Sequence, residues 1–393
     1  MTNKWLLLLP MIYFLTSCSS DTEPETISTT DQDAVLAQFG GDIDLANLPN
    51  YANQEVPGYI SKDNTNDNPI TDKGAILGRV LFYDKNLSSN NTVACANCHQ
   101  QALAFGDDAV ASSGVNGTTG RHSMRLVNSR FADEANFFWD ERANTLEDQT
   151  TQPIQDHVEM GFSGNNGDDS INDLFEKLES IEYYNELFTF VYGDEQVTEE
   201  RMQNALGQFI RSIQSFDAKY DVGRALAGNN NAGFPNFTEQ ENDGKDLFMQ
   251  RANLNNNGLR IGGGLGCDAC HRAPEFDIDP NSRNNGIITS LQNPNELDTD
   301  VTRSPTLRDL FNTSAQANGP MMHTGFTTDF GEVLEHYNTI QSTGNGLDRR
   351  LDENGNPQNL AMTTAEKEAV TAFIMTLSGT DVYTNEKWSD PFK

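Results

Sequence analysis

Four of the five cysteines lie in two copies of one short pattern, and a histidine follows the second cysteine of each copy. The copies are Cys95-Ala96-Asn97-Cys98-His99 and Cys267-Asp268-Ala269-Cys270-His271. The spacing C-x-x-C-H is typical of covalent haem c attachment, in which both thiols add to haem vinyl groups and the histidine ligates the iron. A redox dithiol or half of a zinc site is the alternative for a C-x-x-C pair alone. The histidine in both copies favours haem, so we predict two covalently bound haem c groups, with His99 and His271 as iron ligands.

The surroundings of the two motifs are also repeated, and their pattern is helical. Leu77–Phe82 precedes the first motif and Gly244–Phe248 precedes the second, and each segment predicts a short helix that leads into a haem loop. Apolar residues recur at three- and four-residue spacing over 202–216, and a capping box at Thr363 and Glu366 starts another amphipathic helix. No convincing alternating strand pattern is present. We therefore predict a mainly α fold with two cytochrome c-like haem domains and long loops.

Length and charge define the class of protein further. A chain of 393 residues is long enough for two domains with separate cores. We predict an N-terminal haem domain over 51–225 and a C-terminal one over 226–393, with a linker rich in glycine and asparagine over 223–239. Asp and Glu number 58 against 26 Lys and Arg, which gives a formal charge of −32. Such a chain repels phosphate backbones, so nucleic-acid binding is excluded as a function and a cationic partner is favoured.

The N-terminus has the pattern of an exported lipoprotein. Lys4 precedes an apolar run from Trp5 to Leu15 that is too short to span a bilayer, so residues 1–17 are predicted to be a signal peptide. Leu15-Thr16-Ser17-Cys18 resembles a bacterial lipobox, which makes Cys18 the predicted lipid anchor. A plain signal peptide with an incidental cysteine is the alternative. Residues 18–50 are predicted to form an acidic tether, and the protein to be lipid-anchored to a bacterial membrane, facing the periplasm or the cell surface.

Beyond the haem motifs, the sequence resembles the bacterial dihaem cytochrome c peroxidase family, which includes the MauG-type enzymes. The resemblance covers about Pro69 to Ser378. The segments that carry it are Leu77 to His99, Phe138-Trp139-Asp140-Glu141-Arg142-Ala143, Pro153 to Met160, and Arg303-Ser304-Pro305-Thr306-Leu307-Arg308. In that family the N-terminal haem reacts with peroxide and the C-terminal haem transfers electrons. The resemblance therefore implies these roles for the haems on His99 and His271, and implies that Arg303 is a cofactor-binding residue.

The resemblance also implies three catalytic residues. Glu159 matches the family's distal glutamate, which takes a proton from one peroxide oxygen and returns it to the other. Gln149 matches the glutamine that lines the same pocket. Trp139 resembles the tryptophan that relays electrons between the haems, although a packing role at the domain interface is compatible with the same position. Without the resemblance, a lone Glu in so acidic a chain would be read as a solvated surface charge.

The sequence departs from the simplest peroxidase pattern at both irons. The loop Ser113–Gly120 lacks the histidine that blocks the peroxidatic iron in members needing reductive activation, so the resemblance implies an open haem of the MauG type. His122 stands where the family usually has asparagine, and either a buried structural role or iron ligation fits it. That asparagine contributes to a calcium site between the haems. Histidine is a poor calcium ligand, so a calcium ion here is doubtful, with backbone carbonyls near Asn318 and Pro320 as the remaining ligands.

At the second haem, Tyr337 lies fourteen residues after the turn histidine His323, where the family has its methionine ligand. Helical spacing over 330–338 sets Tyr337 on the apolar face. The resemblance to the MauG type then implies Tyr337 as the sixth ligand. An oxygen donor would lower the ferric haem's potential relative to methionine. The alternative is a core tyrosine bonded to a propionate. The fallback ligands are then His336, Met321 or Met322.

These features lead to a functional prediction with two alternatives. We predict a cytochrome c peroxidase that reduces hydrogen peroxide to water with electrons from a small cytochrome c or copper protein. The electrons would pass from the C-terminal to the N-terminal haem, and the acidic surface suits a positively charged donor. One alternative is a MauG-type oxidase that modifies a partner protein. The other is a non-catalytic dihaem electron carrier. Family members are often homodimers, which no residue tests, and the membrane contact expected is through the N-terminal lipid alone.

Overall fold

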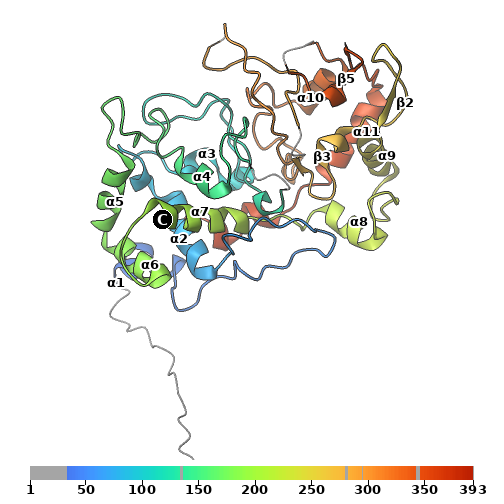
Figure 1. The fold of residues 1–393 in the computed structure, drawn as a ribbon. Coiled ribbons are helices and arrows are strands. Elements are labelled where there is room, and N and C mark those ends of the chain that lie inside the picture. The colour runs from blue at the N-terminus through green and yellow to red at the C-terminus, as the bar shows by residue number, and fades with distance from the viewer. Residues whose placement is uncertain (1–32, 133–135, 279–281, 294, 342–345, 393) are drawn as a thin grey trace, which may run out of the picture.

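The chain is mainly helical, with short strand pairs set between long loops (Figure 1). The computed structural model describes residues 33–392 except 133–135, 279–281, 294 and 342–345. The helices are α1 (Asp33–Phe39), α2 (Asp72–Tyr83), α3 (Cys95–Cys98), α4 (Leu146–Thr151), α5 (Ile171–Glu179), α6 (Glu182–Tyr192), α7 (Glu199–Ser212), α8 (Lys219–Ala227), α9 (Glu239–Met249), α10 (Phe330–Asn338) and α11 (Thr364–Met375). The strands are β1 (Ala252–Leu254), β2 (Arg260–Gly263), β3 (His271–Arg272), β4 (Asp277–Ile278), β5 (Asp352–Glu353) and β6 (Asn356–Pro357). They form three antiparallel pairs, β1–β2, β3–β4 and β5–β6.

The internal sequence repeat is also a structural repeat. The helix before the first haem motif, α2, packs on α7, and the helix before the second, α9, packs on α11. A glycine permits each close crossing. A Cβ on Gly78 would lie 2.0 Å from the carbonyl oxygen of Ala205, and a Cβ on Gly244 would lie 1.9 Å from that of Ala369. Since any side chain there would separate the helices, the two glycines allow both helix pairs to cross closely.

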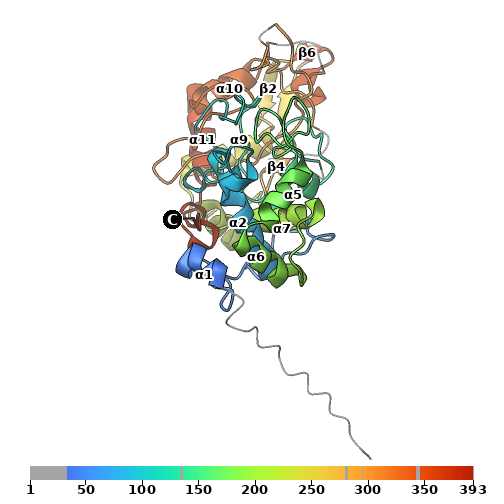
Figure 2. The ribbon, with the colours of Figure 1, turned by 90° about the vertical axis from the view of Figure 1, so that its left-hand side faces the viewer.

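Each helix crossing carries its own hydrophobic core. The first core is built mainly from α1, α2, α6 and α7, and the second from α9, α10, α11 and the loops around them. Figures 1 and 2 show the two groups of helices at opposite ends of the molecule, with the long loops between them. The fold prediction, mainly α with two cytochrome c-like haem halves and long loops, is confirmed. The domain limits 51–225 and 226–393 stay a prediction.

The segment expected to be the end of the tether is part of the first core. Val35, Phe39, Ile43 and Leu45 are buried, and α1 packs against α6. The carboxylate of Glu186 accepts hydrogen bonds from the backbone N–H groups of residues 34 and 35 at 2.9 Å each, which caps the start of α1. The prediction of a tether over 18–50 is therefore wrong for residues 33–50, because apolar residues at helical spacing bury one face of α1. Cys18 and residues 1–32 lie outside the described residues.

The C-terminal segment returns to the first core instead of staying with the second. Trp388 is 1% exposed in the first core, and its indole N–H donates to Ser212 Oγ at 3.2 Å. The hydroxyl of Tyr83 donates to the carbonyl oxygen of Trp388 at 2.7 Å. The last residues thus tie the second half of the chain to α2 and α7 of the first (Figure 1). In the part of the chain described, no helix has the length and apolarity that a membrane span requires.

Candidate active site

The first C-x-x-C-H motif forms one helical turn, α3, whose cysteines line a cavity. The turn is capped from within, because Asn97 Oδ1 accepts a hydrogen bond from the backbone N–H of Ala94 at 2.8 Å. Directly after the turn, His99 Nδ1 lies 3.3 Å from the carbonyl oxygen of Phe105. A histidine whose Nδ1–H is held by a carbonyl leaves Nε2 for a metal. The local structure thus prepares His99 for ligation on one side only.

The cavity beside α3 brings together the residues expected at the first haem. Its volume is about 510 Å³, within the range of cofactor pockets, and Cys95, Cys98, His99, Gln149 and Glu159 all line it. Burial raises the pKa of Cys95 to about 12 and that of Cys98 to about 11, so both thiols are protonated at neutral pH. Burial lowers the pKa of His99, so its imidazole is neutral there.

Those protonation states bear on which group the motif binds. A redox dithiol needs a thiolate of lowered pKa, which these thiols do not have. Among the residues that the structure describes, no group of three or more His, Cys, Asp or Glu is arranged to hold a metal ion, so a zinc site finds no further ligands there. Two neutral thiols and a neutral imidazole along one cavity wall fit covalent haem c.

Gln149 reaches the cavity because the opposite side of α4 is fixed to α7. Glu147 forms an ion pair with Arg211, with Oε2 3.0 Å from Nη2, and its Oε1 accepts from Asn68 at 2.7 Å. Two residues further along a helix lies about 200° around its axis, on the far side. The buried contact of Glu147 with α7 therefore turns Gln149 toward the cavity, where it lies with Glu159.

Glu159 is the residue of this cavity whose pKa suits acid–base chemistry at neutral pH. Its pKa is raised to about 7, first by burial and then by the negative charge of Asp156, while Arg142 opposes the shift. A carboxyl group with a pKa close to neutral can both accept and donate a proton at physiological pH, as a general acid–base requires. A solvated surface carboxylate, the reading favoured by sequence alone, would not show this shift.

The loop 113–120 clamps the turn that carries Glu159. The backbone N–H of Val115 donates to the carbonyl oxygen of Glu159 at 3.0 Å, and that of Asn116 donates to the carbonyl oxygen of Val158 at 3.1 Å. Gly114 has no room for a side chain, since a Cβ would lie 2.1 Å from the Val158 carbonyl oxygen and 2.7 Å from the Glu159 Cα. The loop that lacks the blocking histidine is therefore packed against the proton-transfer group.

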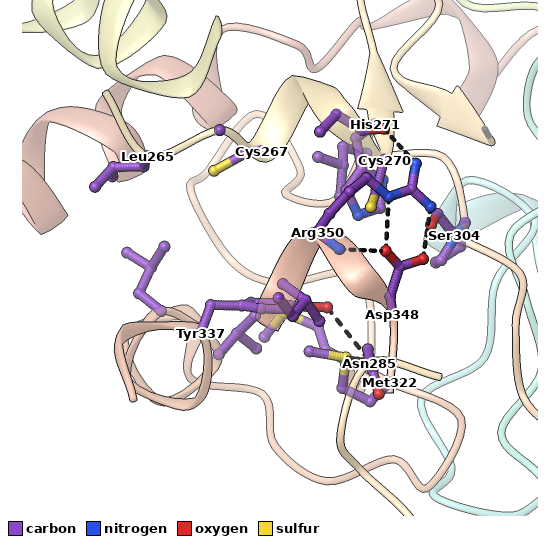
Figure 3. Close-up of a pocket in the computed structure, with 18 of the residues that line it drawn as sticks. Leu265, Cys267, Cys270, His271, Asn285, Ser304, Met322, Tyr337, Asp348 and Arg350 are labelled. Carbon is purple, nitrogen blue, oxygen red and sulfur yellow. Dashed lines mark hydrogen bonds and ion pairs between the residues drawn. The ribbon is translucent and has the colours of Figure 1, made fainter. Parts of the chain in front are cut away.

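The second C-x-x-C-H motif lines a larger cavity of about 780 Å³, together with Tyr337 and Met322 (Figure 3). Burial raises the pKa of Cys267 to about 12, and it lowers that of His271 to about 4 against the opposing effect of the Pro305 carbonyl. His271 and Cys267 are therefore a neutral imidazole and a neutral thiol, as His99 and Cys95 are in the first cavity. This donor set fits a second haem c.

An arginine outside the motif holds the second haem segment in place. The carboxylate of Asp348 accepts from Arg350 Nε at 2.8 Å and Nη2 at 2.6 Å. The remaining nitrogen, Arg350 Nη1, donates to the carbonyl oxygen of Ala269, inside the C-x-x-C motif, at 2.7 Å. Figure 3 shows this ion pair beside His271 at the wall of the cavity. The Asp348 carboxylate thus orients a guanidinium that fixes the backbone between the two cysteines.

Tyr337 projects from α10 into the second cavity, and Figure 3 shows it across from the cysteines and His271. Its hydroxyl oxygen lies 3.2 Å from Asn285 Nδ2, which also lies 3.5 Å from the sulfur of Met322. Burial raises the pKa of Tyr337, and the Asn285 hydrogen bond opposes that effect. The same amide therefore touches two of the candidate sixth ligands, with the phenolic oxygen nearer to it.

The other fallback ligands lie differently. Met321 is 6% exposed, also lines the second cavity and belongs to the second core. His336 Nε2 lies 2.9 Å from the carbonyl oxygen of Asn285, and the side chain does not line the cavity. Tyr337 lines the cavity, which agrees with its expected place on the apolar face of α10. The assignment of the sixth ligand itself stays a prediction.

Trp139 lies between the two cavities and lines both of them. Its indole N–H donates to the carbonyl oxygen of His122 at 2.7 Å, and its ring packs edge-on against that of His323 with centroids 6.1 Å apart. On the other side, its carbonyl oxygen accepts from the backbone N–H of Arg303 at 3.1 Å. Trp139 is 8% exposed, so its indole is packed at the wall that the two cavities share.

Arg303 and His122 also line both cavities. The guanidinium of Arg303 lies over the ring of Phe137, with 4.7 Å to the ring centroid, and donates to the carbonyl oxygen of Asn136. A buried cation at the wall of both cavities suits an anionic group of a cofactor. His122 is 5% exposed, and its Nδ1 lies 2.8 Å from the carbonyl oxygen of Ala109. That contact supports the structural role for His122 and leaves one ring nitrogen unassigned.

Asn318 and Pro320 mark the region where backbone carbonyls were expected to bind calcium. The side-chain amide of Asn318 donates to the carbonyl oxygen of Asp309 and to the hydroxyl of Tyr383, at 2.8 Å each. Pro320 lines the second cavity. No acidic side chain joins them in a cluster of three or more among the described residues. A calcium ion stays an untested prediction.

Two residues of the site were not found from the sequence. Arg125 lines both cavities next to Trp139, and its guanidinium Nη2 donates to the carbonyl oxygen of Thr306 at 3.3 Å. Asn285 is the residue that contacts Tyr337 and Met322. Both lie in loops, where no periodicity marks a buried position. The one available signal was the position of Arg125, three residues after His122 in a loop that the resemblance already placed near the haems.

Comparisons with known proteins agree with this arrangement. Residues 72–231 match the family model of the di-haem cytochrome c peroxidases. A methylamine utilization protein MauG from Methylophilus methylotrophus is 28% identical over 85% of this chain and 90% of its own length. A cytochrome c551 peroxidase from Nitrosomonas europaea is 26% identical over 78% of this chain and 80% of its own length.

Solved structures give the same result for the fold. A MauG-like protein associated with microbial copper homeostasis is similar with a TM-score of 0.64 and 25% identity, over 87% of this chain and 99% of its own. The dihaem peroxidase BthA from Burkholderia thailandensis shares the fold with a TM-score of 0.56 at 18% identity, over 86% of this chain and 94% of its own. Together these comparisons confirm the resemblance found in the sequence, to the dihaem cytochrome c peroxidases and MauG. Proteins of this family carry two c-type haems and catalyse redox reactions.

Proposed function

We propose that this protein is a dihaem cytochrome c peroxidase, which reduces hydrogen peroxide to water with electrons from a small redox protein. One turnover consumes one peroxide, two electrons and two protons and yields two water molecules. The electrons come from the donor protein, and the protons come from solvent. Support comes from the cavity that Glu159 shares with the first C-x-x-C-H motif, and from Trp139 on the wall that this cavity shares with the second.

The first cavity supplies the proton chemistry. A haem c attached at Cys95 and Cys98 and ligated by His99 would supply the iron that binds peroxide and takes up electrons. Glu159, with its pKa near 7, would accept a proton from one peroxide oxygen and deliver it to the other, which leaves as water when the O–O bond breaks. Gln149, on the same cavity wall, is placed to hold peroxide by a hydrogen bond from its side-chain amide.

The second cavity supplies the electrons, which we propose pass to the first through Trp139. Its indole borders both cavities, and its N–H is held by the His122 carbonyl, so the ring keeps one orientation. Tyr337 is proposed as the oxygen ligand of the haem on His271, and Arg303 as a partner of haem at the shared wall. An acidic protein of charge −32 would attract a basic donor, such as a small cytochrome c or copper protein.

The observation that carries the proposal is Glu159, a partly buried carboxyl group of raised pKa in the cavity of the first haem motif. The test is peroxide-dependent oxidation of a reduced small cytochrome c by a form that begins after Cys18, measured in fully oxidised and in half-reduced enzyme. Glu159→Gln is the matched variant, and it should lose turnover while keeping both haems. Asp148→Asn, an exposed carboxylate on α4, is the control and should keep it.

The outcomes separate the candidate functions. Fast turnover from the oxidised enzyme means a peroxidase with an open iron. Turnover only after half-reduction means a resting ligand such as His122. No turnover in either state, while peroxide still changes the haem spectra, would refute the peroxidase and favour a MauG-type oxidase. Haem spectra that do not respond to peroxide would leave the dihaem electron carrier as the remaining candidate function.

One observation favours the MauG-type oxidase as a second candidate. Tyr337 projects into the second cavity across from His271, and an oxygen ligand would hold that haem at low potential. Such a haem would store oxidising equivalents for a partner protein instead of accepting electrons from a mild donor. A search for peroxide-dependent modification of proteins crosslinked to this chain would test this candidate directly.

The site of action is proposed from the N-terminus. Cys18 would carry the lipid after removal of residues 1–17, and the body would be held outside the cytoplasm, where haem c is attached. Metabolic labelling with a fatty acid should mark the wild-type chain and not Cys18→Ala. A wild-type chain that takes up no label would refute the anchor without bearing on the peroxidase activity.

A further inference from the structure

Asp156 lines the cavity that holds Glu159 and is also exposed to solvent, so it lies where the cavity opens. It precedes Glu159 by three residues in the same turn. Its side chain is therefore close to the proton-transfer group in space as well as in sequence.

The hydrogen bonds of Asp156 organise the turn that carries Glu159. One carboxylate oxygen, Oδ1, accepts from the backbone N–H of Val158 at 2.7 Å and from that of Glu159 at 2.9 Å. The carbonyl oxygen of Asp156 accepts from the backbone N–H groups of Met160 at 3.2 Å and Gly161 at 2.8 Å. Four consecutive amides after Asp156 thus donate to this one residue. The orientation of Glu159 depends on it directly, since its own N–H is one of the four.

Few charges face Glu159 from the elements packed around it. Asp156 lies on its own turn, and Arg142 lies on the segment after Trp139. The thiols of Cys95 and Cys98 face it from α3, and both would be uncharged thioethers once haem is attached. The loop 113–120 contacts the turn and contains no charged side chain. Asp156 is therefore the negative charge of greatest influence on Glu159.

We propose that Asp156 is a positioning residue for Glu159, holding its backbone through one carboxylate oxygen and placing a negative charge beside it at the opening of the cavity. This rests on the proposed function, in which Glu159 accepts the proton of peroxide. A carboxylate beside another carboxyl group favours the protonated form. Asp156 would thus keep Glu159 able to hold a proton near neutral pH and would keep its backbone in the orientation that aims it at peroxide.

Two substitutions separate the charge from the hydrogen bonds. Asp156→Asn removes the charge but keeps an oxygen that can accept from both amides, whereas Asp156→Ala removes both. Because Glu159 must be ionised to accept a proton, kcat/KM for peroxide rises with pH through its pKa. In the Asn variant this rise should move to lower pH, and kcat/KM at pH 5.5 should increase about threefold to tenfold with no change at pH 9. In the Ala variant kcat/KM should fall at every pH.

Asp148→Asn is the control for charge alone, because it removes an exposed carboxylate of α4 that is not among the groups acting on Glu159. Its pH profile should match that of the wild type. Unchanged haem spectra in all three variants would show that both haem segments are still folded. A profile of Asp156→Asn that superimposes on the wild type, or one that moves to higher pH, would overturn the proposal.

A second readout does not need turnover. The infrared band of the protonated Glu159 carboxyl, identified by its loss in Glu159→Gln, can be titrated in the haem-loaded protein. Its midpoint should fall in Asp156→Asn and stay in place in Asp148→Asn. If the wild type shows no peroxide turnover but the band shifts as expected, the proposed function fails and the effect of Asp156 stands. If turnover depends on Glu159 but the midpoint stays unchanged, the proposal on Asp156 alone fails.

Discussion

Replacing Glu159 by Gln should remove activity and stabilise the folded protein at the same time. Burial raises the pKa of Glu159 from an ordinary 4.5 to about 7. Below pH 4.5 the carboxyl is protonated in the folded and unfolded chains alike, so it contributes no difference. Between pH 4.5 and 7 the folded chain keeps a proton that the unfolded chain has released. Above pH 7 both are ionised, and the folded state carries the full cost of a buried charge.

That cost can be worked from the two pKa values. A difference between 4.5 and about 7 corresponds to about 3 kcal/mol, at 1.36 kcal/mol for each factor of ten. Gln has nearly the same shape and no charge, so the variant should avoid this cost. At pH 8 its free energy of unfolding should exceed that of the wild type by up to about 3 kcal/mol. At pH 4 the two proteins should be equally stable.

The assay is urea unfolding of the haem-loaded wild type and Glu159→Gln at pH 8 and pH 4, followed by far-UV circular dichroism, with peroxide turnover measured on the same samples. Asp148→Asn serves again as control and should change neither property. Equal midpoints of wild type and variant at pH 8 would refute the raised pKa. Retained turnover in the variant would refute the proton-transfer role, whatever the stability.

Three further predictions concern the path between the cavities and the irons. Trp139→Phe should keep both haems but slow electron equilibration between them several-fold, measured by stopped-flow spectroscopy after half-reduction; an unchanged rate would exclude the indole as a relay. Tyr337→Phe removes the phenolic oxygen, so the reduction potential of the second haem should rise in a spectroelectrochemical titration, and a constant potential would show that Tyr337 is not a ligand. His122→Ala should leave the ferric spectrum of the first haem unchanged, because its ring is held by the Ala109 carbonyl; conversion from low to high spin would identify it as the resting ligand.

The helices could be predicted where amphipathic spacing and caps coincide. The segment 330–338 is α10 with the expected bounds, and the capping box of Thr363 and Glu366 starts α11. The helix expected over 202–216 ends earlier, at Ser212, and Ile213 is its extended cap. Part of the expected linker over 223–239 is the end of α8 instead, which stops at a left-handed Gly228.

The strands, and the contacts between residues far apart in the sequence, could not be predicted. The pairs β1–β2, β3–β4 and β5–β6 have strands of two to four residues, too short to leave an alternating pattern. Burial of Trp388 in the first core depends on a chain that crosses back from the second, and no local pattern encodes such a return. α1 was not predicted because an acidic, serine- and threonine-rich stretch precedes it. The helix has only 7 residues, so its apolar face is too short to show a helical pattern.

In the candidate site too, some residues could be predicted from the sequence and others could not. The motifs and the resemblance identified the side chains that carry the chemistry, since these are fixed by type and spacing. The groups that position them were not predicted, because Asp156, Arg350 and Asn285 lie in loops, where no periodicity marks a residue that forms hydrogen bonds. Asp156 acts within its own turn. Arg350 and Asn285 act on Ala269 and Tyr337, which are far away in sequence, and only the folded chain brings those pairs together.

The two candidate functions use the same first cavity and the same direction of electron flow through Trp139, and they differ in the source of the electrons. In a peroxidase, a small redox protein would give electrons to the haem on His271, and they would move to the haem on His99. In a MauG-type oxidase, the electrons would follow the same path but would come from residues of a partner protein, which is modified as it is oxidised. Glu159 and Trp139 serve both, so neither can decide between them. The decision rests on Tyr337, because its oxygen would lower the potential of the second haem and so make acceptance of electrons from a mild donor less favourable. The potential of that haem therefore separates the two functions more directly than any measurement at the peroxide site.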